Sequence, residues 1–115
     1  MLFRSLHIDS GRAYLYGSNR AGGGIVIADL TDPWNPVYLG QYSGSYVHDG
    51  YVRNDTLYAA HISNGFFSVM DVSNPAAPVI LKTHSTPGNL THNTWLSDDS
   101  KTLFTTDEVD RKSVV

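Results

Sequence analysis

The residues best suited to chemistry in this sequence are its histidines and the acids near them. The chain has five histidines, no cysteine, and ten Asp but one Glu among its eleven acids. Neutral imidazoles and carboxylates suit zinc, iron or manganese, and three such ligands with an open position support hydrolytic chemistry. Without cysteine, disulfides, thiolate zinc sites and cysteine nucleophiles are excluded. The candidate metal ligands are His48, His61, His92 and Asp107.

A repeat of about 42 residues would bring these side chains together. The segment 29–37 reads DLTDPWNPV, and the segment 71–79 reads DVSNPAAPV, at an offset of 42. A histidine opens a strand-like segment at positions 7, 48 and 92. The segments 13–18, 56–61 and 102–107 form a third recurring landmark. Three landmarks with one period are typical of a repeat architecture.

The strand signals within each period predict an all-β fold. Val, Ile, Thr, Tyr, Phe and Trp make up 37 of 115 residues, and these residue types favour strands. In the second repeat, strands are expected over 48–52, 56–62, 66–72 and 79–84. The third strand of each repeat is apolar on consecutive residues, so we expect cover on both of its faces. Four-stranded antiparallel units of this length are typical of β-propeller blades.

The number of repeats predicts a partial β-propeller. One domain spans 1–115, with repeats at approximately 3–44, 45–88 and 89–115, which gives two full blades plus a truncated third. The segment 112–115 is expected to be the third strand of that last blade, cut midway. Propellers close with about 4–8 blades, so we expect a fragment of a longer chain. Its uncovered ends predict self-association, as a homodimer, or association with the remaining blades.

Propeller geometry places the candidate ligands at one mouth of the central channel. First-strand starts and second-strand ends share that mouth, so we expect His48 beside His61 and His92 beside Asp107. The alternative is architectural, in which His7, His48 and His92 recur because each blade needs the same hydrogen bond. Their recurrence in every repeat favours the architectural interpretation.

The ends of the second strands carry a different signal. Ser18, His61 and Asp107 occupy this position and differ between the repeats, which is typical of a site on a repetitive scaffold. Aromatic residues are expected at the same mouth, where they can stack on a carbohydrate or a peptide. The candidate ligand-binding residues are Tyr46, Asp49, Tyr51 and Trp95. Packing between blades is the alternative role for the aromatic members.

The third strands also carry a family resemblance. The segments 25–33, IVIADLTDP, and 67–75, FSVMDVSNP, resemble the LVIVD repeat, with departures at Ser68 and Met70. The segments 44–49, 91–99 and 106–110 are similar to the choice-of-anchor B group of bacterial β-propellers. The resemblance implies a secreted or surface-attached bacterial propeller, and it implies no catalytic residues.

Charge and hydropathy argue against two classes of function, nucleic-acid binding and a role within a membrane. The formal charge is −3 with no basic block, which argues against a nucleic-acid partner. No apolar run approaches the ~20 residues of a membrane span, and the first residues do not form a signal peptide. We expect a non-enzymatic extracellular binding or scaffold domain without a cofactor. The alternative is a metal-dependent hydrolase or oxidoreductase with a divalent ion at the channel mouth. No pattern identifies the ligand or the substrate.

Overall fold

The protein is built from β-strands, as the composition predicts. The structure is a computed structural model that describes residues 1–108. Within this range there is no α-helix, only the short 3₁₀ segment η1 (Asn19–Ala21), and no helix could span a membrane. The strands are β1 (Ser5–Asp9), β2 (Arg12–Ser18), β3 (Gly24–Asp29), β4 (Val37–Tyr42), β5 (Asp49–Arg53), β6 (Thr56–His61), β7 (Phe66–Asp71), β8 (Val79–Ser85), β9 (Thr91–Leu96) and β10 (Leu103–Asp107).

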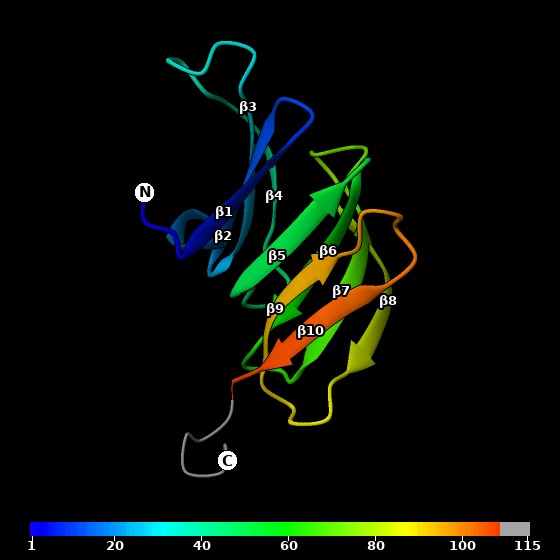
Figure 1. Cartoon of the computed structure of the whole chain (residues 1–115). Coiled ribbons are helices and arrows are strands. Elements are labelled where there is room, and N and C mark those ends of the chain that lie inside the picture. Colours follow the sequence, from blue (N-terminus) through cyan, green and yellow to red (C-terminus); the bar gives the residue numbers. More distant parts are fainter. Residues whose placement is uncertain (109–115) are drawn as a thin grey trace.

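The strands form two four-stranded antiparallel sheets and one hairpin (Figure 1). Sheet A has the order β1-β2-β3-β4, sheet B has the order β5-β6-β7-β8, and hairpin C pairs β9 with β10. The prediction of four strands in each of the first two repeats is therefore confirmed. The third repeat contributes two strands to the described part of the chain. The strand predicted over 112–115 lies outside the described residues.

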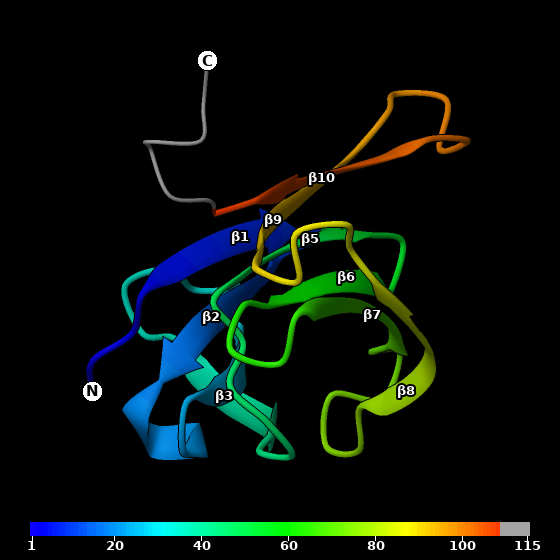
Figure 2. The same cartoon turned by 90° about the horizontal axis from the view of Figure 1, so that it is seen from below.

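The first strands of the three units lie side by side. Strand β5 lies between β1 and β9 (Figure 1). The other strands of sheets A and B extend away from these first strands (Figure 2). Strand β9 also contacts β6, and the Thr94 hydroxyl donates to the Tyr58 carbonyl over 2.6 Å. Hairpin C therefore covers mainly the β5 and β6 half of sheet B.

Sheets A and B repeat each other in strand register. In sheet A the β3–β4 pairing passes from Gly40 to Tyr38, which leaves Leu39 as the extra residue of a β-bulge. In sheet B the β7–β8 pairing passes from Lys82 to Ile80, which leaves Leu81 as the extra residue. The two bulges are 42 residues apart, the offset predicted from the sequence. Bulges bend the strand that carries them, so both outer strands curve at the same place.

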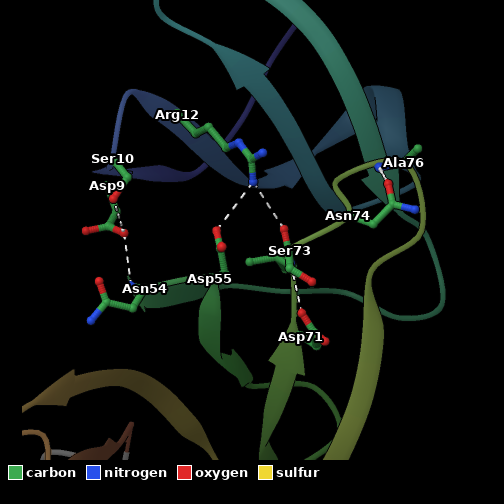
Figure 3. Close-up of polar contacts among 10 residues, drawn as sticks. Asp9, Ser10, Arg12, Asn54, Asp55, Asp71, Ser73, Asn74 and Ala76 are labelled. Carbon is green, nitrogen blue, oxygen red and sulfur yellow. Dashed lines mark hydrogen bonds and ion pairs between the residues drawn. The ribbon is translucent and has the colours of Figure 1, made fainter.

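The proline-containing turns after β3 and β7 have the same two side-chain-to-backbone hydrogen bonds. After β7, the Asp71 carboxylate accepts from the Ser73 N–H over 2.9 Å, and the Asn74 side chain accepts from the Ala76 N–H over 3.1 Å (Figure 3). Such Asx turns end a strand because a side-chain oxygen replaces the next ladder partner. The same two bonds occur in the first repeat, from Thr31 to Asp29 over 3.0 Å and from Trp34 to Asp32 over 3.1 Å.

The main core lies between sheets A and B. Both sheets contribute large buried side chains, and sheet A supplies the two tyrosines. The buried residues of this core include Tyr14, Tyr16, Ile25, Ile27, Val52, Leu57, Ala59 and Met70. Strand β3 is buried over 24–28, which confirms the expectation for a doubly covered strand. For β7 that expectation is wrong, because Phe67 and Val69 are only half-buried. Hairpin C covers mainly β5 and β6, so one face of β7 keeps contact with solvent.

Polar contacts at the edge of the core join the two sheets. The Arg12 guanidinium lies 3.5 Å from the Asp55 carboxylate and donates to the Val72 carbonyl over 3.3 Å (Figure 3). The turn that begins at Pro75 packs directly on β4 at Gly40. A Cβ atom on Gly40 would lie 1.9 Å from the Pro75 carbonyl oxygen. The glycine is therefore required by a close approach of two backbones.

Candidate functional site

Two of the predicted metal ligands meet across the boundary between sheet B and hairpin C. His48 directly precedes β5, His92 is the second residue of β9, and their ring centroids are 4.7 Å apart. Glu108 directly follows β10, and its Oε2 lies 3.9 Å from His92 Nε2. Donor atoms of all three residues lie within 4.8 Å of one another. We call His48, His92 and Glu108 the His–His–Glu cluster.

A β-bulge directs His92 toward this cluster. In hairpin C, Thr106 pairs with Asn93 and Asp107 pairs with Thr91, so His92 is the extra residue of the bulge. A bulge of this kind interrupts the alternation of side chains and turns the extra residue away from its regular direction. Beyond the bulge, the Glu108 N–H donates to the Leu90 carbonyl over 2.8 Å, which holds the backbone of Glu108 beside β9.

His48 is positioned by its neighbours. Its N–H donates to the Ala60 carbonyl over 2.9 Å, and its Nδ1 lies 3.0 Å from the Tyr46 hydroxyl. This leaves Nε2 as the ring atom available to a ligand. Burial, followed by the charges of His92 and Arg4, lowers the pKa of His48 below its usual value. The imidazole is therefore neutral at neutral pH, the form that binds metals.

His61 lies in the core rather than in the cluster. Its Nε2 lies 2.7 Å from the Ser68 hydroxyl, and its Nδ1 lies 2.9 Å from the Ser45 hydroxyl and 3.1 Å from the Tyr46 carbonyl. Because a carbonyl only accepts, we assign the proton to Nδ1, and Nε2 accepts from Ser68. Burial lowers the pKa of His61 to about 4. Ser68 departs from the apolar third-strand pattern, and this buried bond accounts for the departure.

Asp107 is likewise held in a separate network. Its carboxylate accepts from the Thr86 hydroxyl, from the Gly88 N–H over 2.8 Å and from the Leu90 N–H over 3.2 Å. The bond from Thr86, assisted by the two backbone donors, lowers the pKa of Asp107. The carboxylate therefore fastens the turn before β9 to the end of β10. The sequence predicted that His61 and Asp107 would lie with His48 and His92. In the structure, His61 and Asp107 instead belong to two separate hydrogen-bond networks.

His7 is a correction to the predicted histidine repeat. It lies in the middle of β1 and pairs with Tyr14, in the same way as Tyr51 pairs with Tyr58. Its structural equivalent is thus Tyr51 and not His48. The spacing between histidines does not give this equivalence, because the hairpin turn fixes the register of each strand pair. His7 Nδ1 accepts from the Val52 N–H over 2.9 Å, a bond that joins sheets A and B.

Equivalent positions on the three first strands instead form a row of rings. The centroids of His7 and Tyr51 are 4.6 Å apart, and those of Tyr51 and Trp95 are 4.7 Å apart. The sequence did not reveal this row, because its three members are different amino acids. Each of them pairs with an aromatic residue on the next strand. Counting back from the hairpin turns would have found it.

The four expected ligand-binding residues lie at three different places in the structure. Tyr51 and Trp95 belong to the ring row, and Tyr46 contacts His48 of the His–His–Glu cluster. Asp49 accepts from the Ser5 hydroxyl over 2.9 Å and from its neighbouring Gly50 N–H over 2.9 Å, so it fastens sheet B to sheet A. The arrangement offers two imidazoles and a carboxylate at one point, with a strip of rings along the first strands.

A scan against protein-family models found no match, and a search of curated proteins found none either. Glu108 was not among the ligands predicted from the sequence, although it is the chain's one Glu and follows the second strand of the third repeat.

Proposed function

We propose that this chain is a non-enzymatic scaffold segment of a β-propeller of the LVIVD kind, which binds further sheets of its own type face to face. The observation that carries the proposal is that each end of the stack exposes large apolar side chains at positions whose equivalents inside the stack are buried or half-buried. The 42-residue repetition of strands, bulges and turns supports the assignment to a repeat architecture.

One such face is the outer face of sheet A. Leu6 and Ile8 on β1 are 49% and 56% exposed. Their equivalents on β5, Gly50 and Val52, are buried. An apolar sheet face of this kind marks an interaction surface. We define the outer face of sheet A as Leu6, Ile8, Ala13, Leu15, Val26 and Ala28. Leu6 and Ile8 are its exposed members, Leu15 is half-buried, and the three smaller or more central side chains are already buried within the chain.

The opposite end of the stack exposes the complementary face. Trp95 and Phe104 pair across hairpin C and are 60% and 59% exposed. The equivalent pair in sheet B is Tyr51 and Tyr58, of which Tyr51 is buried and Tyr58 half-buried. Inside the stack, a face of the first kind always meets one of the second kind. The partner proposed for the isolated chain is therefore a second copy, with its hairpin C on the outer face of sheet A.

The oligomeric state tests this proposal. Light scattering during size exclusion is expected to give a mass above the 12.6 kDa of one chain. The double variant Leu6→Lys/Ile8→Lys places two charges on the outer face of sheet A and is expected to be monomeric, because unpaired charge is costly to bury. Val79→Lys/Leu81→Lys is the matched control, since these residues are exposed on the edge strand β8.

A mixing experiment distinguishes this head-to-tail contact from a symmetric one. Trp95→Lys/Phe104→Lys blocks the other face, so this variant alone is also expected to be monomeric. Mixed with Leu6→Lys/Ile8→Lys, it should form a dimer, because each variant supplies the intact face that the other lacks. A wild-type chain that stays monomeric, or a mixture that does, would contradict the proposed contact.

A metal-dependent hydrolase or oxidoreductase is the weaker candidate. Of its four expected ligands, His61 and Asp107 are held by hydrogen bonds within the fold. The extracellular setting and a protein or carbohydrate ligand remain part of the proposal through the family resemblance and the exposed ring of Trp95.

A further inference from the structure

We propose that the His–His–Glu cluster binds one divalent transition-metal ion, with Zn²⁺ as the preferred ion. This inference does not depend on the scaffold function, because the cluster lies within one chain. It differs from the sequence-based expectation in its ligand set, which is His48, His92 and Glu108 rather than a set with His61 and Asp107.

The distances require only a small contraction. Zinc bonds of about 2.0–2.1 Å in a tetrahedral site place ligand atoms roughly 3.3 Å apart. The His92 Nε2 and Glu108 Oε2 atoms are 3.9 Å apart, and all donor atoms lie within 4.8 Å. The side chains of His92 and Glu108 are 43% and 62% exposed, so both can rotate toward a common centre. Three protein ligands leave a fourth position for water or another ligand.

Two independent features of the fold position the imidazoles of this site. The bulge in β9 makes His92 the extra residue and directs it toward His48. The Tyr46 hydroxyl, 3.0 Å from His48 Nδ1, fixes the orientation of that ring. Metal-ligating imidazoles commonly have such a partner on the nitrogen that does not bind the metal. Three donors from the segment before β5, from β9 and from the end of β10 thus converge on one point.

The donor set selects the kind of ion. Two imidazole nitrogens and one carboxylate suit Zn²⁺, whereas Ca²⁺ and Mg²⁺ prefer shells made of oxygen ligands.

Titration of the metal-free chain with ZnCl₂ in a calorimeter tests the site. The wild type is expected to bind one Zn²⁺ per chain, and Co²⁺ should give the visible absorption of a low-symmetry site. His92→Ala and Glu108→Gln should each weaken binding by at least about tenfold, the range seen for disturbed metal shells. Tyr46→Phe should weaken binding by about tenfold. His84→Ala is the matched control, because this exposed histidine on β8 lies outside the cluster, and it should leave the affinity unchanged.

Controls for folding make a loss of Zn²⁺ affinity attributable to the ligands. Glu108 is exposed, so Glu108→Gln reports on the ligand rather than on folding, and far-UV circular dichroism verifies the fold of every variant. No saturable binding of Zn²⁺, an equal loss in His84→Ala, or full affinity in Glu108→Gln and His92→Ala would overturn the site.

Discussion

Acidification should destabilise this protein through His61 before its carboxylates titrate. His61 has a pKa of about 4 in the folded chain, against 6.5 for an unperturbed imidazole. Because the folded pKa is the lower one, the stabilising contribution is complete above pH 6.5 and is lost as the pH falls. Between about pH 7.5 and about pH 4.5, the loss from this one residue is about 2.5 kcal/mol.

The shift arises because the burial of His61 is not offset by a charged hydrogen-bond partner among residues 1–108. His61 is buried, and its hydrogen-bond partners are the hydroxyls of Ser45 and Ser68 and the carbonyl of Tyr46. None of these groups is an anion that could stabilise an imidazolium. Protonation would also remove the lone pair of Nε2 that accepts from Ser68. Both effects favour the neutral ring.

Urea unfolding at several pH values measures this contribution. Far-UV circular dichroism is the suitable signal, because Trp34 and Trp95 are 90% and 60% exposed and report weakly on burial. His61→Gln removes the titration, so its free energy of unfolding should fall less steeply with acid, by about 1.4 kcal/mol per pH unit below the unfolded pKa. His7 and His48 also have lowered pKa values and remain in both proteins, so the difference isolates His61.

An NMR titration of the wild type measures the pKa of His61 directly and does not depend on the folding of His61→Gln. The ring carbon signal of His61 in an NMR titration should show no protonation until the pH is close to the unfolding transition. A folded-state pKa of 6.5 or higher for this ring, or parallel pH dependence of the wild type and His61→Gln, would refute the argument.

Three further predictions concern packing. Gly40→Ala should lower the free energy of unfolding by about 1–3 kcal/mol, because its Cβ would meet the Pro75 carbonyl; an unchanged urea midpoint would contradict this contact. Tyr16→Phe should raise stability by about 1 kcal/mol, because the buried Tyr16 hydroxyl has no hydrogen-bond partner among residues 1–108; a loss of stability would contradict this assignment. Arg53→Ala should speed amide exchange in hairpin C, because Arg53 donates to the Ser97 carbonyl over 2.6 Å; equal exchange rates would argue against that anchor.

Strand positions could be predicted closely from the sequence. In the second repeat, strands were expected over 48–52, 56–62, 66–72 and 79–84, and the structure has them at 49–53, 56–61, 66–71 and 79–85. Turn residues between the strands fix these limits locally, through Asx turns and positive backbone angles such as those of Asn54 and Asp55. Such local signals do not require knowledge of the packing.

The candidate site was predicted only in part. His48 and His92 meet because they hold equivalent places in neighbouring units, which the repeat spacing made visible. Glu108 joins them beyond a bulge, and a bulge cannot be read from alternation of side chains. The burial of His61 depends on Ser68 across the sheet, a pairing that follows from register rather than from spacing along the chain.

NOE measurements between the units offer the most direct test of the stacked, repeated sheets. Contacts are expected between the rings of His7 and Tyr51, 4.6 Å apart, and between those of Tyr51 and Trp95, 4.7 Å apart. Amide contacts should also show that Leu39 and Leu81 are the extra residues of matching bulges. Absence of the ring contacts in the folded chain, or different registers in the two outer strand pairs, would contradict the repeated stack.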